Sequence, residues 1–242
     1  MSYFGKSPAH WQKADSQPVS EADIAVNQYL YDALRTPRPD YGWLSEETED
    51  DNARLGKERV WIIDPIDGTK AFLAGQPHFT ISIAVVENNR PTAAAVYNPA
   101  TEELYTAALG GGAFRNHKPI RISTMGELHN SRICAFEDLF SHPRWADLWP
   151  PMHVENRNSV AYRLALVADG QFDAMLAMNK KSDWDLAAGD LIVHEAGGVM
   201  HGLEGAALQY NTRQTDHQVV MAGSAGLVTE FHHRIARIKQ YL

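Results

Sequence analysis

The chain has 242 residues, 44% hydrophobic and 21% charged, which is enough for one large domain or two subdomains with a sizeable core. Its formal net charge of -8 argues against binding to nucleic acid polymers or anionic membranes, because both require a basic surface. The single cysteine excludes an internal disulfide, and no segment has the pattern of a membrane span or a secretory leader. We therefore expect a cytoplasmic protein that acts on small partners.

The first clear element in the chain is a helix that follows Pro18. Ser20 is the expected N-cap, and Asp23, three residues later, can close a capping box. Apolar residues then recur at helical spacing until Pro37 and Pro39 end the pattern. These apolar residues are Val26, Tyr29, Leu30, Ala33 and Leu34. An acidic run over 46–51 follows, which on its own is typical of a solvated loop. We expect residues 49–57 to form a mobile surface loop.

The most informative stretch is 61–70, with the sequence WIIDPIDGTK. Its apolar start predicts a buried strand that ends at Asp64, and a proline and a glycine mark the turn that follows. Asp64 and Asp67 can direct their carboxylates at one point, with the Ile66 carbonyl as a third oxygen ligand, a set that favours Mg²⁺ or Ca²⁺ over zinc. If Gly68 and Thr69 open a helix, their backbone amides suit a phosphate. An ordinary turn with Asp67 as a helix cap is the structural alternative.

The rest of the chain divides into two patterns. Short β-type segments at 80–86, 92–97, 103–108 and 112–114 are separated by turn residues, which predicts an antiparallel meander. Further on, strands at 132–136, 172–178, 199–201 and 218–221 alternate with helices at 159–168, 186–195 and 227–242. We therefore expect an α+β half over 1–125 and an α/β half over 126–242.

Several motifs, in this order, resemble those of the inositol monophosphatase superfamily. Residues 64–69 resemble its D-P-[IL]-D-G-T signature, and residues 184–198 resemble its W-D-x-A-A-G and E-A-G-G block. The segment 19–23 is similar to its V-[TS]-x-x-D motif, and Glu46-Glu47 to its G-E-E motif, with Ser45 in place of the usual glycine. Members of this superfamily are Mg²⁺-dependent, lithium-sensitive phosphomonoesterases. The resemblance implies a layered αβαβα sandwich of the inositol monophosphatase / sugar phosphatase type.

The resemblance also implies a role for each matched residue. Two to three Mg²⁺ ions are expected to be held by Glu46, Asp64, the Ile66 carbonyl, Asp67 and Asp185. Glu46 is also implied to activate the attacking water, which Thr69 positions, while Asp23 orients Thr69. Gly68 and Thr69 are implied to hold the phosphate. Without the resemblance, Asp185 at the start of its helix has the pattern of an N-cap.

The substrate is less well defined by the motifs. In inositol-specific members a glutamate that contacts substrate hydroxyls corresponds to Met178, which argues against strict specificity for inositol 1-phosphate. The segment 68–72 resembles the D-G-T-K-x-F motif of 3'(2'),5'-bisphosphate nucleotidases, and Lys180 and Lys181 can meet a second phosphate, although a solvated basic loop explains them equally well. We expect a bisphosphorylated nucleotide. The alternatives are inositol 1-phosphate, histidinol phosphate, or a non-catalytic regulatory role in the same fold.

Two further expectations concern assembly. Proteins of this superfamily usually carry another N-terminal helix before a segment like residues 3–6, so we expect a shortened N-terminus that affects packing more than chemistry. They are commonly homodimers, so the expected macromolecular partner is a second copy of the chain.

Overall fold

In the computed structural model, residues 1–13, 17–143 and 145–238 are described. The α-helices are α1 (Glu21–Leu30), α2 (Thr69–Leu73), α3 (Asp138–Ser141), α4 (Val160–Ala168), α5 (Asp183–Glu195) and α6 (Ala225–Ile238). Shorter helical turns are the π-helical segment Tyr31–Arg35 and the 3₁₀ segments Ala53–Gly56 and Ala146–Leu148. Residues 239–242, the end of the last predicted helix, lie outside the described part of the chain.

The strands form two main sheets and two small hairpin-like pairs. The seven-stranded sheet has the order β3-β4-β5-β6-β7-β8-β9, with β3 (Gly42–Ser45), β4 (Arg59–Asp67), β5 (Thr80–Glu87), β6 (Arg90–Asn98), β7 (Glu103–Ala108), β8 (Gly112–Arg115) and β9 (Lys118–Pro119). The five-stranded sheet has the order β11-β10-β12-β16-β14, with β10 (Arg132–Cys134), β11 (His153–Glu155), β12 (Ala174–Ala177), β14 (Val199–Gly202) and β16 (Val220–Gly223). The pairs are β1 (His10–Gln12) with β2 (Pro18–Ser20), and β13 (Lys181–Ser182) with β15 (Asp216–His217).

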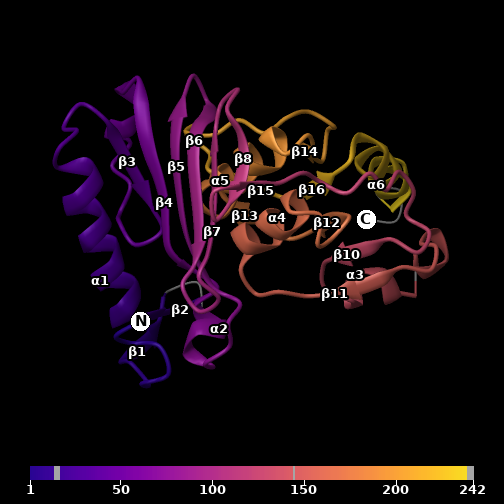
Figure 1. Cartoon of the computed structure of the whole chain (residues 1–242), viewed down its shortest axis with the longest axis horizontal. Coiled ribbons are helices and arrows are strands. Elements are labelled where there is room, and N and C mark those ends of the chain that lie inside the picture. Colours follow the sequence, from indigo (N-terminus) through magenta and orange to yellow (C-terminus); the bar gives the residue numbers. More distant parts are fainter. Residues whose placement is uncertain (14–16, 144, 239–242) are drawn as a thin grey trace.

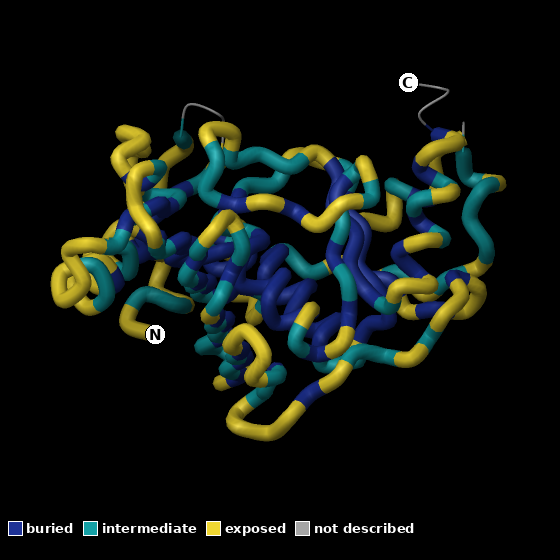
Figure 2. The backbone as a smooth tube through the Cα atoms, turned by 90° about the horizontal axis from the view of Figure 1, so that it is seen from above, coloured by how far each residue is buried: buried dark blue, intermediate teal, exposed yellow. Residues whose placement is uncertain are grey.

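These elements stack in five layers (Figure 1). Helix α1 covers one face of the seven-stranded sheet, α4 and α5 fill the space between the sheets, and α3 and α6 lie beyond the five-stranded sheet. The two middle helices are almost wholly buried, and Figure 2 shows buried backbone gathered in the centre with exposed loops around it. The predicted αβαβα sandwich is therefore confirmed.

The antiparallel meander predicted for residues 80–114 is also confirmed. Strands β4 to β9 pair in sequence order and antiparallel, and the β5–β6 turn places Asn88 and Asn89 at positive φ. The triple glycine at 110–112 forms the hairpin between β7 and β8 rather than a phosphate loop, as its spacing indicates. The strand β3 was not predicted, because it depends on parallel pairing with β4, which no local pattern in the sequence marks.

The structure corrects two details of the N-terminal half. The predicted apolar face of the first helix is wrong for Tyr29, which is 71% exposed, because the buried residues Ala22 and Leu30 set a different face toward β4. The loop predicted over 49–57 is wrong at its centre. A 3₁₀ turn there buries Arg54, which donates to Asp50, Asn211 and the carbonyl of Thr212. A buried cation requires such partners, so this segment is tied to the C-terminal half.

No helix among residues 1–13, 17–143 and 145–238 is long and apolar enough to cross a membrane.

Candidate active site

The site begins where strand β3 ends beside its parallel neighbour β4. Strands β3 and β4 pair with Ser45 opposite Ile63, so the next residues on each strand, Glu46 and Asp64, emerge side by side. The amide of Glu46 donates to the carbonyl of Ile63 at 3.2 Å, which holds the first residue after β3 against β4. The usual glycine before this glutamate is replaced by Ser45, whose Oγ donates to Asn27 of α1 at 2.7 Å.

Beyond Asp64, β4 has a register irregularity that extends to Asp67. The Oδ1 atom of Asp64 accepts the amide of Ile66 at 3.0 Å, which fixes the turn inside the bulge. Gly68 follows at φ 96°, and helix α2 begins at Thr69, as predicted from the sequence. A Cβ at Gly68 would lie 2.8 Å from the carbonyl oxygen of His78, so only glycine fits this position without movement.

Asp67 is held by the start of helix α4. Its Oδ2 accepts Ser159 Oγ at 2.7 Å and the amide of Ala161 at 2.6 Å. These bonds across 92 residues fix one carboxylate oxygen and leave the other to ligate a cation. Asp67 does not cap α2, because the residue before α2 is Gly68. Ser159 is the N-cap of α4 in the structure, and the sequence carries no signal for its contact with Asp67.

Asp185 comes from the first turn of α5 and is not the N-cap. Helix α5 begins at Asp183 with Ser182 as N-cap, and Asp185 Oδ2 accepts the amide of Ser182 at 2.7 Å. The predicted helix start at 186 is therefore three residues late. Carboxylate oxygens of Asp64, Asp67 and Asp185 lie within 4.8 Å of one another, close enough for one metal ion to contact all three.

Burial of this cluster makes its negative charges costly. Burial raises the pKa of Asp64 well above its usual range, with a further contribution from Glu46 and the other carboxylates. Burial also raises the pKa of Asp185 to about 7, assisted by the charge of Asp67. Hydrogen bonds from Ser159 and Ala161 partly oppose the rise that burial causes in the pKa of Asp67. A divalent cation would relieve this repulsion, and oxygen-only ligands suit Mg²⁺, so these residues fit the expected metal.

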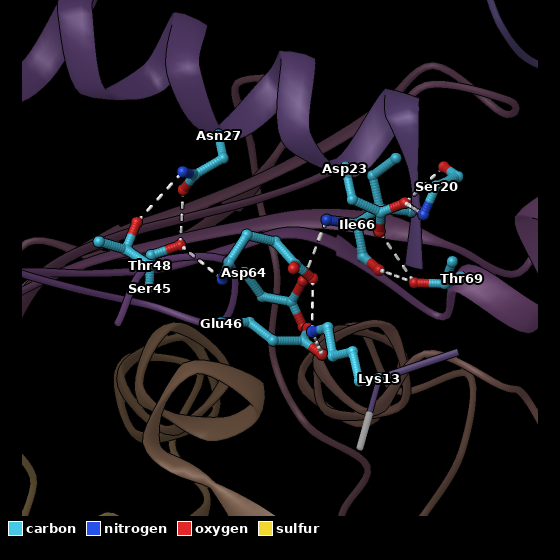
Figure 3. Close-up of polar contacts among 11 residues, drawn as sticks. Lys13, Ser20, Asp23, Asn27, Ser45, Glu46, Thr48, Asp64, Ile66 and Thr69 are labelled. Carbon is cyan, nitrogen blue, oxygen red and sulfur yellow. Dashed lines mark hydrogen bonds and ion pairs between the residues drawn. The ribbon is translucent and has the colours of Figure 1, made fainter. Parts of the chain in front are cut away.

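The predicted contact between Asp23 and Thr69 is present (Figure 3). Thr69 Oγ1 lies 3.0 Å from Asp23 Oδ1 and 3.1 Å from the carbonyl oxygen of Ile66. Asp23 Oδ2 accepts both the amide and the hydroxyl of Ser20, so the capping box of α1 orients this carboxylate. The single hydroxyl hydrogen of Thr69 is donated to one of these two protein oxygens. The lone pairs of Thr69 Oγ1 can therefore accept a hydrogen bond from a group in the cavity.

Glu46 is not part of the three-carboxylate cluster in this structure. Its Oε1 accepts Lys13 Nζ at 2.9 Å (Figure 3). The same ammonium donates to Glu47 Oε1 at 2.7 Å. The contact with Lys13 was missed, because this lysine lies 33 residues before Glu46 in a segment without a clear period. A role for Glu46 as a metal ligand therefore stays a prediction.

These groups line a cavity of about 860 Å³. Lys180 and Lys181 also line it, but Lys180 is paired with Asp216 at 2.9 Å. Met178 is not among the lining residues and packs against the apolar cluster of the C-terminal half, as expected for a thioether beside a buried strand. The structure thus brings together every other predicted site residue except Asp23, which lies behind Thr69.

Comparison with known proteins agrees with this geometry. The model of the inositol monophosphatase family matches residues 1–240. The chain is 37% identical over 201 residues to an inositol-1-monophosphatase of Rhizobium meliloti, covering 80% of this chain and 75% of the relative. It is 36% identical over 204 residues to the Nus factor SuhB of Xylella fastidiosa, covering 81% of this chain and 72% of the relative. It is 30% identical over 217 residues to the 3'(2'),5'-bisphosphate nucleotidase CysQ of Salmonella typhimurium, covering 88% of each.

A solved structure of an inositol monophosphatase from Thermotoga maritima matches the whole fold. Its TM-score is 0.86 at 27% identity, over 100% of this chain and 92% of that chain. The chain therefore belongs to the inositol monophosphatase family of phosphomonoesterases.

Proposed function

We propose that this protein is a Mg²⁺-dependent phosphomonoesterase whose substrate is a 3'(2'),5'-bisphosphorylated nucleotide. A metal-activated water attacks one phosphate of the substrate, in line with the ester bond that breaks. The observation that carries the proposal is the convergence of Asp64, Asp67 and Asp185 from β4 and α5 on one point. Structural carboxylates are rarely buried together without a cation, because their mutual repulsion costs free energy. With Glu46 and the carbonyl of Ile66, the set is large enough for two to three ions.

Each residue of the chain has a distinct task in this proposal. Bound Mg²⁺ would lower the pKa of a water and neutralise charge on the phosphate and the leaving oxygen. Thr69 orients the attacking water through its hydroxyl, which Asp23 holds in place. Glu46, beside Asp64, accepts the proton of that water. Backbone amides of Gly68 and Thr69, which line the cavity, contact the phosphate oxygens.

The nucleotide substrate is supported by two features. The family relatives include a bisphosphate nucleotidase that matches 88% of this chain. Met178 packs into the core, so the position of the inositol-contacting glutamate brings no polar atom to the cavity, whereas two lysines line its wall. Inositol 1-phosphate is the second candidate, favoured by the higher identity to an inositol-1-monophosphatase. Similarity to a Nus factor keeps a non-catalytic regulatory role as a third candidate.

The test is phosphate release from adenosine 3',5'-bisphosphate, inositol 1-phosphate and histidinol phosphate, measured side by side at a series of Mg²⁺ concentrations. We expect Mg²⁺-dependent release, fastest with the nucleotide. Faster release from another ester would reassign the substrate and keep the mechanism. If Mg²⁺ binds by calorimetry but none of the three esters is hydrolysed, the phosphatase proposal fails and the regulatory role is favoured.

A further inference from the structure

Two cations that line the cavity, Arg163 and Lys181, form what we call its basic wall, and Arg163 is a residue that the motifs do not mark. Arg163 lies in α4 and lines the cavity, yet it is only 1% exposed. Its Nε donates to the carbonyl of Arg157 and its Nη1 is buried without a hydrogen-bond partner among the described residues. A buried guanidinium nitrogen without a partner is costly, so this position calls for an anionic ligand.

Neighbouring groups strengthen the attraction of this wall for an anion. The guanidinium carbon of Arg163 lies 4.9 Å from the ring centre of Phe136, which also lines the cavity and covers the cation. Lys181 lines the same cavity and lies close enough to Arg163 for their charges to interact. Its ammonium donates to the carbonyl of Lys180 at 3.3 Å, but among the described residues it forms no ion pair within 4.0 Å. Burial lowers the pKa of both Arg163 and Lys181, as expected for cations whose charge is incompletely compensated.

The carboxylates of the cavity cannot serve as the partner of Arg163 once a metal is bound. Asp67 and Asp185 act on the guanidinium through space, but neither forms an ion pair with it within 4.0 Å in the described structure. A bound cation would neutralise their charge, while Arg163 would remain buried and positive. The loaded site would therefore hold a cationic wall with no counter-charge from the protein.

We propose that Arg163, with Lys181 beside it, forms a second anion subsite that binds a phosphate or carboxylate group of the substrate other than the phosphate being cleaved. The inference rests on the proposed phosphomonoesterase function and narrows the substrate class to small molecules with two anionic groups. It assigns the main contact to Arg163 rather than to Lys180, which is 60% exposed and already paired with Asp216. Guanidinium groups suit this task because they bind such anions in a bidentate manner.

The experiment compares adenosine 3',5'-bisphosphate with adenosine 3'-monophosphate, which has the same cleavable phosphate and lacks the second one. We measure kcat/KM for both in saturating Mg²⁺. The wild-type protein is expected to prefer the bisphosphate by about 10- to 100-fold, the range of one or two charge-assisted hydrogen bonds. Equal kcat/KM values for the two nucleotides in the wild-type protein would overturn the inference without any variant.

Variants locate the effect at Arg163. Arg163→Gln is expected to reduce the preference at least tenfold, mostly through KM for the bisphosphate, and Arg163→Lys to retain part of it. The matched control is Arg157→Gln, which removes the same charge from a side chain paired with Glu155 outside the cavity lining. It should change the preference less than about threefold. A similar loss in both variants, or no loss in Arg163→Gln, contradicts the subsite.

Failure of the proposed function is distinguishable from failure of the subsite. If the wild-type protein hydrolyses neither nucleotide, the nucleotide phosphatase activity is wrong, and the subsite is tested by binding alone. Calorimetry with adenosine 5'-monophosphate in EDTA then reports on the basic wall, because the metal-free carboxylates repel phosphate. At least tenfold weaker binding by Arg163→Gln than by wild type, with Arg163→Lys between the two, supports the subsite, and equal binding by Arg163→Gln and wild type excludes it.

Discussion

Asp64 combines a structural cost with a proposed metal-binding role. It is buried near four other acidic groups that act on its charge, and its Oδ1 accepts the amide of Ile66. Asn at this position keeps that acceptor and removes the charge. The two properties can therefore be separated by one substitution.

Asp64→Asn is expected to stabilise the metal-free protein by about 1–3 kcal/mol, because a buried repulsive charge is lost. It should also slow Mg²⁺-dependent phosphate release by about 10³-fold or more, because one proposed metal ligand loses its charge. The control is Asp51→Asn, since the exposed Asp51 likewise accepts an amide two residues on, that of Ala53. Urea unfolding in EDTA and activity assays are the measurements. Destabilisation of the metal-free Asp64→Asn protein would contradict the charge argument.

Thr69→Val removes the hydroxyl that connects Asp23, the Ile66 carbonyl and the cavity, with little change in volume. We expect kcat to fall about 10²-fold with KM nearly unchanged, because the attacking water loses its orientation while the phosphate contacts stay. Thr69→Ser keeps the hydroxyl and should retain most of kcat. Steady-state kinetics decide this point. Full activity of Thr69→Val, with the loss confined to Thr69→Ser, would mean that the methyl group, rather than the hydroxyl, is what matters.

At the scale of elements, the turn between β4 and α2 depends on a close approach of two chain segments. Gly68 adopts φ 96°, and its Cα faces the backbone of His78 and Ser159. That approach brings the start of α4 next to Asp67. A side chain here therefore affects both folding and the position of a predicted ligand.

Gly68→Ala is expected to cost about 2–4 kcal/mol of unfolding free energy, through positive φ and a contact at 2.8 Å to backbone. Gly75→Ala is the matched control, because Gly75 has φ 67° with nothing within 4 Å of a Cβ. It should cost only about 1 kcal/mol, the penalty of the backbone conformation alone. Denaturant unfolding in EDTA measures the free energy of unfolding of both variants and of the wild-type protein. Equal losses would show that the close approach contributes nothing.

Elements with a local signal were predictable, and those that depend on pairing were less so. The meander, the capping box of Ser20 and Asp23 and the short helix after Gly68 follow from turn residues, caps and periods, and all are present. Strands β3, β11 and β13 were not predicted, and each is held in place by pairing with another strand, β4, β10 and β15 respectively. Arg54 was assigned to a loop because its partners lie 157 and 158 residues away.

At the scale of the whole molecule, the carboxylate cluster draws its residues from different layers of the fold. Strand β4 of the seven-stranded sheet contributes Asp64 and Asp67, and α5 contributes Asp185. A cation that binds all three therefore stabilises the packing of the layers. The division at residues 125 and 126, the homodimer and the cytoplasmic location stay predictions.

Mg²⁺ is expected to raise the melting temperature, because it binds the folded cluster and not the dispersed carboxylates of the unfolded chain. At a concentration 100 times Kd the gain is about 2.7 kcal/mol, or roughly 5–10 °C for a chain of this size. Differential scanning fluorimetry with Mg²⁺ or EDTA measures the shift, with Asp185→Asn as the variant that should lose most of it. An equal shift in wild type and variant would show that Mg²⁺ acts elsewhere.

The metal-free protein is expected to lose stability as the pH rises from about 4 to about 8. Burial raises the pKa of Asp185 to about 7 and that of Asp64 well above its usual range, whereas both titrate near 3.9 when unfolded. Between the unfolded and folded pKa values the folded state binds more protons than the unfolded state. The free energy of unfolding therefore falls as the pH rises through this range. Melting curves in EDTA across this range should show the decline, and Asp185→Asn should reduce it. A melting temperature that rises over the range would contradict the pKa shifts.

The sequence by itself determined the family resemblance, the layered fold and the identity of the acidic residues, because caps, turns and the D-P-I-D-G-T stretch are local patterns. The tertiary structure decided how these residues meet. Asp185 joins Asp64 within 4.8 Å, Ser159 reaches Asp67, Lys13 pairs with Glu46, and Arg163 is buried in the cavity wall. Such contacts arise when α4 and α5 pack between two sheets, and their distance along the chain leaves no periodic trace. Folding brings these separated charges into one cavity, where burial sets their pKa values and their affinity for ligands.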